Sequence, residues 1–217
     1  MDQGGMGSHR HALLAGLAGE VIEIGAGDGK NFPHYPTTVT RVQALEPEPR
    51  LRHLAQAAAG QAPVPIDVTD HLAERLPAPD ASLDAAVFAF TLCTISDPDA
   101  ALREAFRVLR PGGQVRFLEH VRAGTRGLTR LQRLLDASVW PALFGGCRLG
   151  RDTATAIEHA GFTIDRLDGF RFPQGAHPRL IPHPRHRPPA VKGGPATWPR
   201  RPPGNHQDHD HDRQGRA

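Results

Sequence analysis

Three glycines at alternate positions follow a short apolar run near the start of the chain. The segment EVIEIGAGDG places Gly25, Gly27 and Gly29 directly after a predicted buried strand. Glycines at such positions let the backbone turn sharply and approach a ligand without interference from a Cβ atom. A dinucleotide-binding loop has the spacing G-x-G-x-x-G, whereas here the third glycine comes one residue early and Lys30 stands in its place. The loop therefore favours a different ligand, with a nucleotide loop or a purely structural turn as alternatives.

Two carboxylates flank this loop in the sequence. Glu23 stands two residues before the first glycine, where a carboxylate can orient the loop and accept from the ammonium group of a cofactor that carries an amino acid. A pyrophosphate would be repelled by that charge. Glu46 follows the next predicted strand, at the position where an acidic side chain in such sheets accepts from both ribose hydroxyls. Glu48 falls within the helix predicted to follow, so we expect it on the solvated surface.

Three further side chains have types suited to catalysis. His120, with Glu119, ends a predicted strand, and ligands of open α/β sheets bind at the carboxyl ends of strands. Its unperturbed pKa lies near neutrality, so it can take a proton from an acceptor; structural hydrogen bonding to a neighbouring loop is the alternative. Cys93 lies in an apolar run, where an isolated cysteine usually fills the core. Asp152 is typical of a helix N-cap.

The elements that must position these residues alternate along the chain. Short apolar runs rich in Val and Ile are separated by segments of helical period. This alternation predicts an α/β fold, Rossmann-like, with a mostly parallel sheet and helices on both faces. The predicted strands are 20–24, 38–45, 64–68, 83–90, 114–120 and 162–167.

Three predicted helices have recognisable ends. The first begins at Pro47, where a missing N–H costs nothing, and ends at Gly60, with an apolar stripe that includes Leu51 and Leu54. The second starts at the N-cap Asp97 and stops at residues 111–113, and the third runs from the N-cap Asp152 to Gly161. Each of them separates two predicted strands.

The basic excess of the chain belongs to its C-terminal segment. Residues 173–217 hold eight Lys or Arg and three Asp or Glu, so a net charge of +3 leaves residues 1–172 slightly acidic. Phosphate recognition needs cations clustered on a folded face, so we expect no nucleic-acid partner. Ten of the 21 prolines also fall in this segment, which we expect to be disordered. Three closely spaced histidines near its end, at 206, 209 and 211, match no closed metal site, and we expect no metal.

Cysteine content and hydropathy predict a soluble, cytoplasmic protein. Cys93 and Cys147 lie far apart in different contexts and form neither a disulfide framework nor a C-x-x-C pair. No apolar run approaches the roughly 20 residues of a membrane-spanning helix, and we find no signal-peptide pattern. A chain of 217 residues suits one catalytic domain.

An ordered series of motifs gives a family resemblance. The segments EIGAGDGKNFPHYP, ALEPEP, LAERLPAPDASLDAAV, LREAFRVLRPGGQVRFLEHV and LFGGCRLGRDT resemble class I S-adenosylmethionine-dependent methyltransferases. Within that class they are similar to the branch related to ubiquinone/menaquinone C-methyltransferases, which includes animal thiol S-methyltransferases. The resemblance implies S-adenosylmethionine as cofactor and in-line methyl transfer to a small, hydrophobic acceptor. A nucleotide-binding oxidoreductase with a similar sheet and a catalytically impaired cofactor-binding protein are the alternatives.

The resemblance also implies a set of cofactor-binding residues. From the methionine end through the ribose and the adenine to the methyl group they are Glu23, Gly25, Ala26, Gly27, Gly29, Glu46, Pro47, Ala73, Glu74, Phe90 and Thr91. Family members often place an Asp before the Ala-Glu pair, to accept from the adenine amino group, but that position is Leu72 here. Adenine recognition would then rest on backbone groups or on Asp70.

The expected organisation has three parts: a short N-terminal helical cap over 1–19, a methyltransferase domain over 20–172 and the tail over 173–217. Residues 128–144 form an amphipathic insert that in this family tends to roof the acceptor site, although core burial predicts the same apolar stripe. The family usually closes its sheet with an antiparallel strand after 162–172. Runs of Pro, Arg and His follow instead, so we expect that strand to be absent or unrecognisable.

Overall fold

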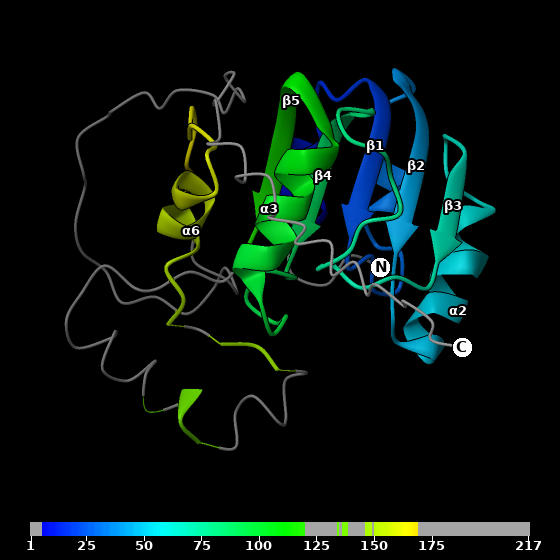
Figure 1. Ribbon diagram of the computed structural model, residues 1–217. Coiled ribbons are helices and arrows are strands. Elements are labelled where there is room, and N and C mark those ends of the chain that lie inside the picture. The colour runs from blue at the N-terminus through cyan, green and yellow to red at the C-terminus, as the bar shows by residue number, and fades with distance from the viewer. Residues whose placement is uncertain (1–5, 120–133, 135, 139–145, 149, 169–217) are drawn as a thin grey trace, which may run out of the picture.

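A five-stranded sheet organises the protein, in the order β3-β2-β1-β4-β5 with every pair parallel (Figure 1). The computed structural model describes residues 6–119, 134, 136–138, 146–148 and 150–168. The strands are β1 (Gly19–Ile24), β2 (Val39–Leu45), β3 (Ile66–Thr69), β4 (Leu83–Ala89) and β5 (Leu109–Leu118). The helices are α1 (Met6–Leu14), the 3-10 helix η1 (Phe32–His34), α2 (Pro49–Ala59), α3 (Pro98–Val108) and α6 (Thr153–His159). The strand order reverses between β1 and β4, which makes their carboxyl ends the expected ligand site.

Helices pack on both faces of this sheet, as the sequence predicts. On one face, Leu102 of α3 and Ile157 of α6 join Ile22 of β1 in a buried cluster. On the other face, Leu14 of α1 and Ala55 of α2 join a second cluster. Successive side chains of a strand point to opposite faces, so residues 21–24 of the central strand β1 are buried on both faces of the sheet. The α/β, Rossmann-like prediction is confirmed.

Helix α2 begins two residues later than the sequence predicts. Its N-cap is Glu48, whose carboxylate accepts hydrogen bonds from the N–H groups of Arg50 and Leu51 at 3.1 and 2.7 Å. Pro49, and not Pro47, therefore occupies the first helical position. Glu48 is exposed, as expected, but it lies before the helix and not within it.

The predicted apolar stripe of α2 is wrong at its two leucines. Leu51 is 37% exposed and Leu54 is 45% exposed, whereas Ala55 is fully buried. A Cβ atom on Gly29 would stand 2.9 Å from the Cβ of Ala58. The glycine loop approaches the helix closely, so small side chains face it and the leucines point away.

Helix α3 begins as predicted and ends early. The side chain of Asp97 caps it by accepting from the N–H of Ala100 at 2.8 Å. The helix stops at Val108, and Leu109 already has an extended backbone and pairs with Leu83 of β4. The Pro-Gly-Gly sequence that we expected to end the helix lies inside β5, at a register shift against β4. Asp152 caps α6 as predicted, with the N–H of Thr155 as donor at 3.3 Å.

The predicted strand at 162–167 is wrong. Phe162 is buried edge-on against Phe106, with ring centres 5.4 Å apart, but Leu167 is half exposed and no ladder forms there. A strand needs a neighbour for its backbone groups, and within the described residues β5 pairs with β4 alone. His120, most of the insert at 128–144 and the tail at 173–217 lie outside the described residues. In the part of the chain that is described, no helix is long and apolar enough to cross a membrane.

Candidate active site

The glycine loop joins β1 to η1 and leaves one position open. Gly25, Gly27 and Gly29 all have positive φ, at +72°, +59° and +79°. A Cβ atom on Gly25 would stand 2.5 Å from Oγ1 of Thr91, so that glycine is needed for close packing. A Cβ atom on Gly27 would meet nothing within 4 Å. Gly27 thus borders the space in which a ligand could lie against the backbone.

Glu46 connects this loop to the start of α2. It follows β2 directly and is buried. Its Oε2 accepts from the N–H of Gly27 at 2.7 Å, and its Oε1 accepts from the N–H of Glu48 at 3.0 Å. The N–H groups of Gly25 and Ala26 donate to the carbonyl of Leu45. A ligand that reached Gly27 would therefore also be next to the Glu46 carboxylate, as the sequence analysis expects.

Glu23 lies beneath the loop, and only 1% of its surface is exposed. Its two carboxylate oxygens accept from Nδ2 of Asn31 and from the hydroxyl of Tyr35, both at 2.7 Å. Burial raises the pKa of Glu23 to about 7, against the lowering effect of these hydrogen bonds and of Arg10. The sequence pattern predicts no role for Asn31 or Tyr35, although Tyr35 is the chain's single tyrosine and follows the loop.

Arg10 of α1 also meets this group. Its Nη1 donates to Oδ1 of Asn31 at 2.5 Å, and its Cζ lies 5.9 Å from the centre of the Phe90 ring. Residue 10 lies in the predicted N-terminal helical cap, and the sequence pattern indicates no contact between this residue and the glycine loop. Twenty-one positions separate Arg10 from Asn31, so no local spacing relates them.

Phe90 and Thr91 close the carboxyl end of β4. The strand ends at Ala89, and Phe90 has a φ of +59°, which is strained for a residue with a side chain. The N–H of Phe90 donates to the carbonyl of Leu118 at 2.7 Å. The Thr91 hydroxyl donates to the carbonyl of Ile24 at 2.8 Å. These bonds tie the end of β4 to its two neighbouring strands, and they put Thr91 against the glycine loop.

Glu119 holds the loop that follows β4. Its carboxylate accepts from the N–H groups of Thr91, Leu92 and Cys93 at 2.8, 2.9 and 3.1 Å. Burial raises the pKa of Glu119, although these three bonds act in the opposite direction. The residue therefore has a structural role at the edge of the site, and its neighbour His120 lies outside the described residues.

The two cysteines, far apart in the sequence, are neighbours in space. Their sulfur atoms are 3.7 Å apart, both residues are buried and both are free thiols. Burial raises the pKa of Cys93, with a further contribution from Glu119, and burial also raises that of Cys147. Neutral, buried thiols agree with the core-filling interpretation of Cys93.

Ala73 and Glu74 lie in the loop after β3, apart from the contacts of the glycine loop. Ala73 is buried in the cluster that faces α3, and Glu74 accepts from the hydroxyl of Ser96 at 3.3 Å. Asp70 pairs with Arg52 at 3.2 Å, whereas Leu72 is exposed. The contacts between Gly25, Gly27, Glu46 and Thr91 thus form one group, and Ala73 and Glu74 contact a different part of the same edge.

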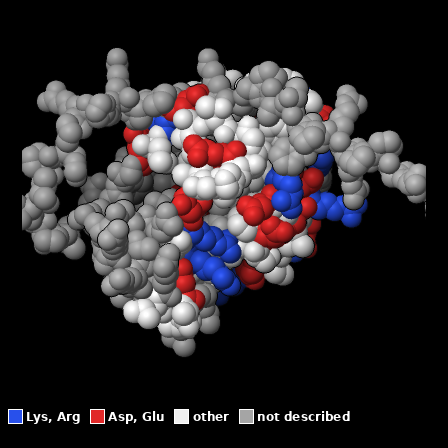
Figure 2. Space-filling model, turned by 60° about the vertical axis from the view of Figure 1, so that its left-hand side comes forward, with Lys and Arg blue, Asp and Glu red and all other residues white. Residues whose placement is uncertain are grey.

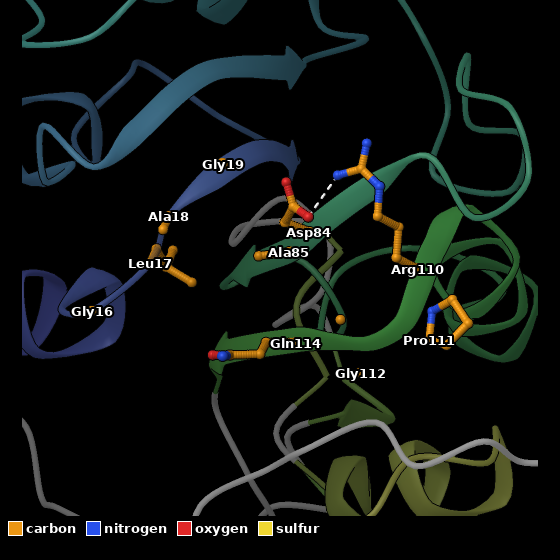
Figure 3. A pocket seen from close by; sticks show the side chains of 11 residues that line it. Gly16, Leu17, Ala18, Gly19, Asp84, Ala85, Arg110, Pro111, Gly112 and Gln114 are labelled. Atoms are coloured by element: carbon orange, nitrogen blue, oxygen red, sulfur yellow. Dashed lines mark hydrogen bonds and ion pairs between the residues drawn. The ribbon is translucent and has the colours of Figure 1, made fainter.

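Two cavities lie outside the glycine loop. One, of about 430 Å³, opens at the amino ends of β1, β4 and β5, and its charged side chains Asp84 and Arg110 pair with each other at 2.6 Å (Figure 3). Open α/β sheets bind their ligands at the opposite edge, so its size does not make it the active site. A second cavity, of about 200 Å³, lies between α3 and α6, and Leu92 is one of the residues that line it.

Comparisons with known proteins agree with this arrangement. Residues 22–117 match the family model described as a methyltransferase domain. The human thiol S-methyltransferase TMT1A is 33% identical over 166 residues, which cover 74% of this chain and 67% of that protein. The UbiE ubiquinone/menaquinone biosynthesis C-methyltransferase of Caulobacter sp. (strain K31) is 50% identical over 58 residues, which cover 27% and 23%. A SAM-dependent methyltransferase from Methanosarcina mazei matches in fold, with a TM-score of 0.55, 22% identity and coverage of 68% and 81%.

Proposed function

The chain belongs to the class I family of S-adenosylmethionine-dependent methyltransferases, and from that premise we propose that it methylates a small, apolar acceptor, with thiols as the first class to test. S-adenosylmethionine is the cofactor, and when bound it supplies a methyl group activated by a sulfonium. The observation that carries the proposal is the open space beside Gly27, with the buried Glu46 carboxylate next to it.

The donor set fits this cofactor and its charge. Glu46 can accept from ribose hydroxyls with a charged carboxylate, which makes strong hydrogen bonds. Glu23 adds a second acidic group beneath the loop, and such charge favours a cationic sulfonium and ammonium over a pyrophosphate. We propose that Gly25, Ala26, Gly27 and Gly29 line the methionine end. Pro47, Ala73, Glu74, Phe90 and Thr91 complete the proposed cofactor site.

The acceptor class rests on two separate observations. The relative that matches most of the chain is named a thiol S-methyltransferase, whereas the named C-methyltransferase matches only a short stretch. The cavity between α3 and α6 has an apolar side and a polar side, the first from Leu92, Pro98, Leu102 and Ala156 and the second from Arg151, Asp152 and Thr153. Leu92 directly follows Thr91 at the site. A small, partly apolar pocket suits a small organic molecule better than a macromolecule.

A thiol must lose its proton to become a strong nucleophile. We propose that His120, two residues beyond the end of β5, accepts this proton. The remaining rate enhancement would come from alignment of the acceptor and exclusion of water. The protein's own thiols, Cys93 and Cys147, have raised pKa values and take no part in this step.

No nucleic-acid partner is proposed. Lys and Arg side chains on the face drawn in Figure 2 are interspersed with Asp and Glu and form no continuous basic surface. Nucleic-acid binding needs such a surface. We also propose a cytoplasmic location, because two thiols whose sulfur atoms lie 3.7 Å apart without a bond suit a reducing compartment.

A methyl-donor assay tests the function. Purified protein is incubated with S-adenosylmethionine and, in separate reactions, a thiol, a phenol, a quinol and an amine, and methylated product is measured by mass spectrometry. We expect methylated thiophenol at a higher rate than methylated phenol or aniline. Product from the quinol alone would overturn the thiol proposal and leave the methyltransferase assignment intact.

A further inference from the structure

Helix α1 brings a fixed positive charge to the glycine loop. Leu13 and Leu14 of α1, with Leu17 just beyond it, are buried in the cluster on that face of the sheet. α1 also contacts η1, where the rings of His11 and His34 meet edge to face at 6.5 Å. These contacts fix α1 against the sheet and η1, and the Arg10 guanidinium then contacts Asn31 and the ring of Phe90.

Arg10 and Glu23 lie on opposite sides of one amide. Oδ1 of Asn31 accepts from Nη1 of Arg10 at 2.5 Å, and Nδ2 of Asn31 donates to Oε1 of Glu23 at 2.7 Å. The guanidinium also lies over the ring of Phe90, at the carboxyl end of β4. A cation and an anion are thus held a fixed distance apart at the edge of the loop that carries Gly27.

This arrangement matches the amino-acid end of the cofactor, which has one carboxylate and one ammonium group. We propose that Arg10 binds the carboxylate of the cofactor's methionine end, so that α1 is part of the cofactor site. A guanidinium carries five N–H donors in a planar fork, so it can donate to Asn31 and to a carboxylate at the same time. Arg10 is partly exposed. Its guanidinium can therefore contact a ligand while it stays packed against Phe90. The inference rests on the proposed cofactor site and is independent of the acceptor.

A structural role for Arg10 would give a different result in binding experiments. If it only held Asn31 and packed on Phe90, its loss would weaken every ligand of the loop equally. If it binds the carboxylate, its loss weakens only ligands that have one. Two related probes separate these cases: S-adenosylhomocysteine, and S-adenosyl-3-thiopropylamine, which keeps the ammonium group but lacks the carboxylate.

The experiment is calorimetric titration of the full chain with both probes. We expect Arg10→Met to raise the dissociation constant for S-adenosylhomocysteine by about 10- to 100-fold, the usual effect of losing charge-assisted hydrogen bonds. The constant for S-adenosyl-3-thiopropylamine should change by less than about threefold. Lys30→Met is the matched control, because Lys30 is also a cation at the loop but pairs with Asp28 at 2.8 Å and is 67% exposed. It should leave both constants unchanged.

Two results would overturn the inference. If Arg10→Met raised the dissociation constants of both probes equally, Arg10 would only support the structure of the loop. If the affinity for S-adenosylhomocysteine were unchanged, Arg10 would not be part of the site. The ratio of the two constants is measured within each variant, so a partial loss of stability does not affect it. If the wild-type protein bound neither probe, the proposed cofactor site would be wrong, and so would the proposed role of Arg10.

Discussion

The acidic side chains at the two ends of the sheet have different kinds of partner. At the amino end, Asp84 pairs with Arg110 at 2.6 Å and also accepts from the N–H of Glu20 (Figure 3). At the carboxyl end, Glu23, Glu46 and Glu119 accept from neutral N–H and O–H groups, and within the described residues none of them forms an ion pair. Acidic groups are paired with a cation at the amino end, and at the carboxyl end they are held by neutral donors.

This difference matters more than the size of the openings. The cavity at the amino end is about 430 Å³, yet its two charged side chains already satisfy each other. The carboxyl end concentrates acidic groups that a cationic cofactor would stabilise. A buried charge without an opposite partner is costly, and such cost is commonly found at functional sites.

Loss of the open glycine should have the largest effect. In Gly27→Val, a β-branched side chain would occupy the space beside the loop and resist the φ of +59°. We expect cofactor binding to be abolished in calorimetric titration. Gly112 at the amino end is a matched control, because its φ is +83° and its Cβ would also meet nothing within 4 Å. Gly112→Val should lose stability and still bind; equal binding by both variants would contradict the contrast between the ends.

The two ends should also respond to pH with opposite signs. The folded pKa of Glu23 is about 7, above the ordinary value of 4.5 for a glutamate, so the folded state binds more protons between these pH values. The free energy of unfolding should therefore fall as pH rises from about 4.5 to 7, by at most about 3 kcal/mol. Glu23→Gln should remove this slope. Urea denaturation of the ligand-free protein across that range measures it.

Asp84 gives the comparison. Burial would raise its pKa, but hydrogen bonds from Arg110 and from the Glu20 N–H overcome that and lower it below the ordinary value of 3.8 for an aspartate. Its contribution is therefore present above that value and is lost as pH falls below it. Asp84→Asn should flatten stability only in the acid range. If Glu23→Gln kept the full fall in the free energy of unfolding between pH 4.5 and 7, another group would be responsible for it.

Removal of the ribose acceptor should have a smaller effect. We expect Glu46→Ala to weaken cofactor affinity by about 1.5–3 kcal/mol, through loss of charged hydrogen bonds. The same variant also loses the bond from the Gly27 N–H, so Glu46→Gln, which keeps an acceptor oxygen, should recover part of the affinity. Asp84→Ala is the control and should bind normally. An unchanged dissociation constant in Glu46→Ala would remove Glu46 from the site.

Deletion of residues 176–217 should have the smallest effect on cofactor binding. The segment has little apolar content and no regular period, so we expect it to contribute nothing to the core. Titration and size-exclusion chromatography of the truncated protein check this. Lost binding or aggregation would mean that part of the tail covers the edge of the sheet.

The sequence predicts the strands of the sheet well, because each strand holds a short stretch rich in Val, Ile, Leu or Ala between recognisable turns and helices. It also identifies Asp97 and Asp152 as helix caps, because capping depends on residues a few positions apart. It fails at 162–167, where the apolar pattern is present but no strand among the described residues pairs with it. Local pattern cannot show whether a partner exists.

The site is predicted less completely than the fold. Glu46 and the glycines follow strands directly, so their position at one edge follows from the topology. Asn31, Tyr35 and Arg10 act through contacts that the chain makes after folding. The same holds for Cys93 and Cys147. They are 54 positions apart in the sequence, but their sulfur atoms are 3.7 Å apart in space.

One titration tests the central claim, that the acidic groups gathered at the carboxyl end of the sheet serve a cationic cofactor. Purified wild-type protein is titrated in a calorimeter with S-adenosylmethionine and, separately, with NADH. We predict saturable binding of S-adenosylmethionine with one site per chain, loss of that binding in Gly27→Val, and no binding of NADH. Binding of NADH without S-adenosylmethionine would contradict the account and support a nucleotide-binding oxidoreductase instead.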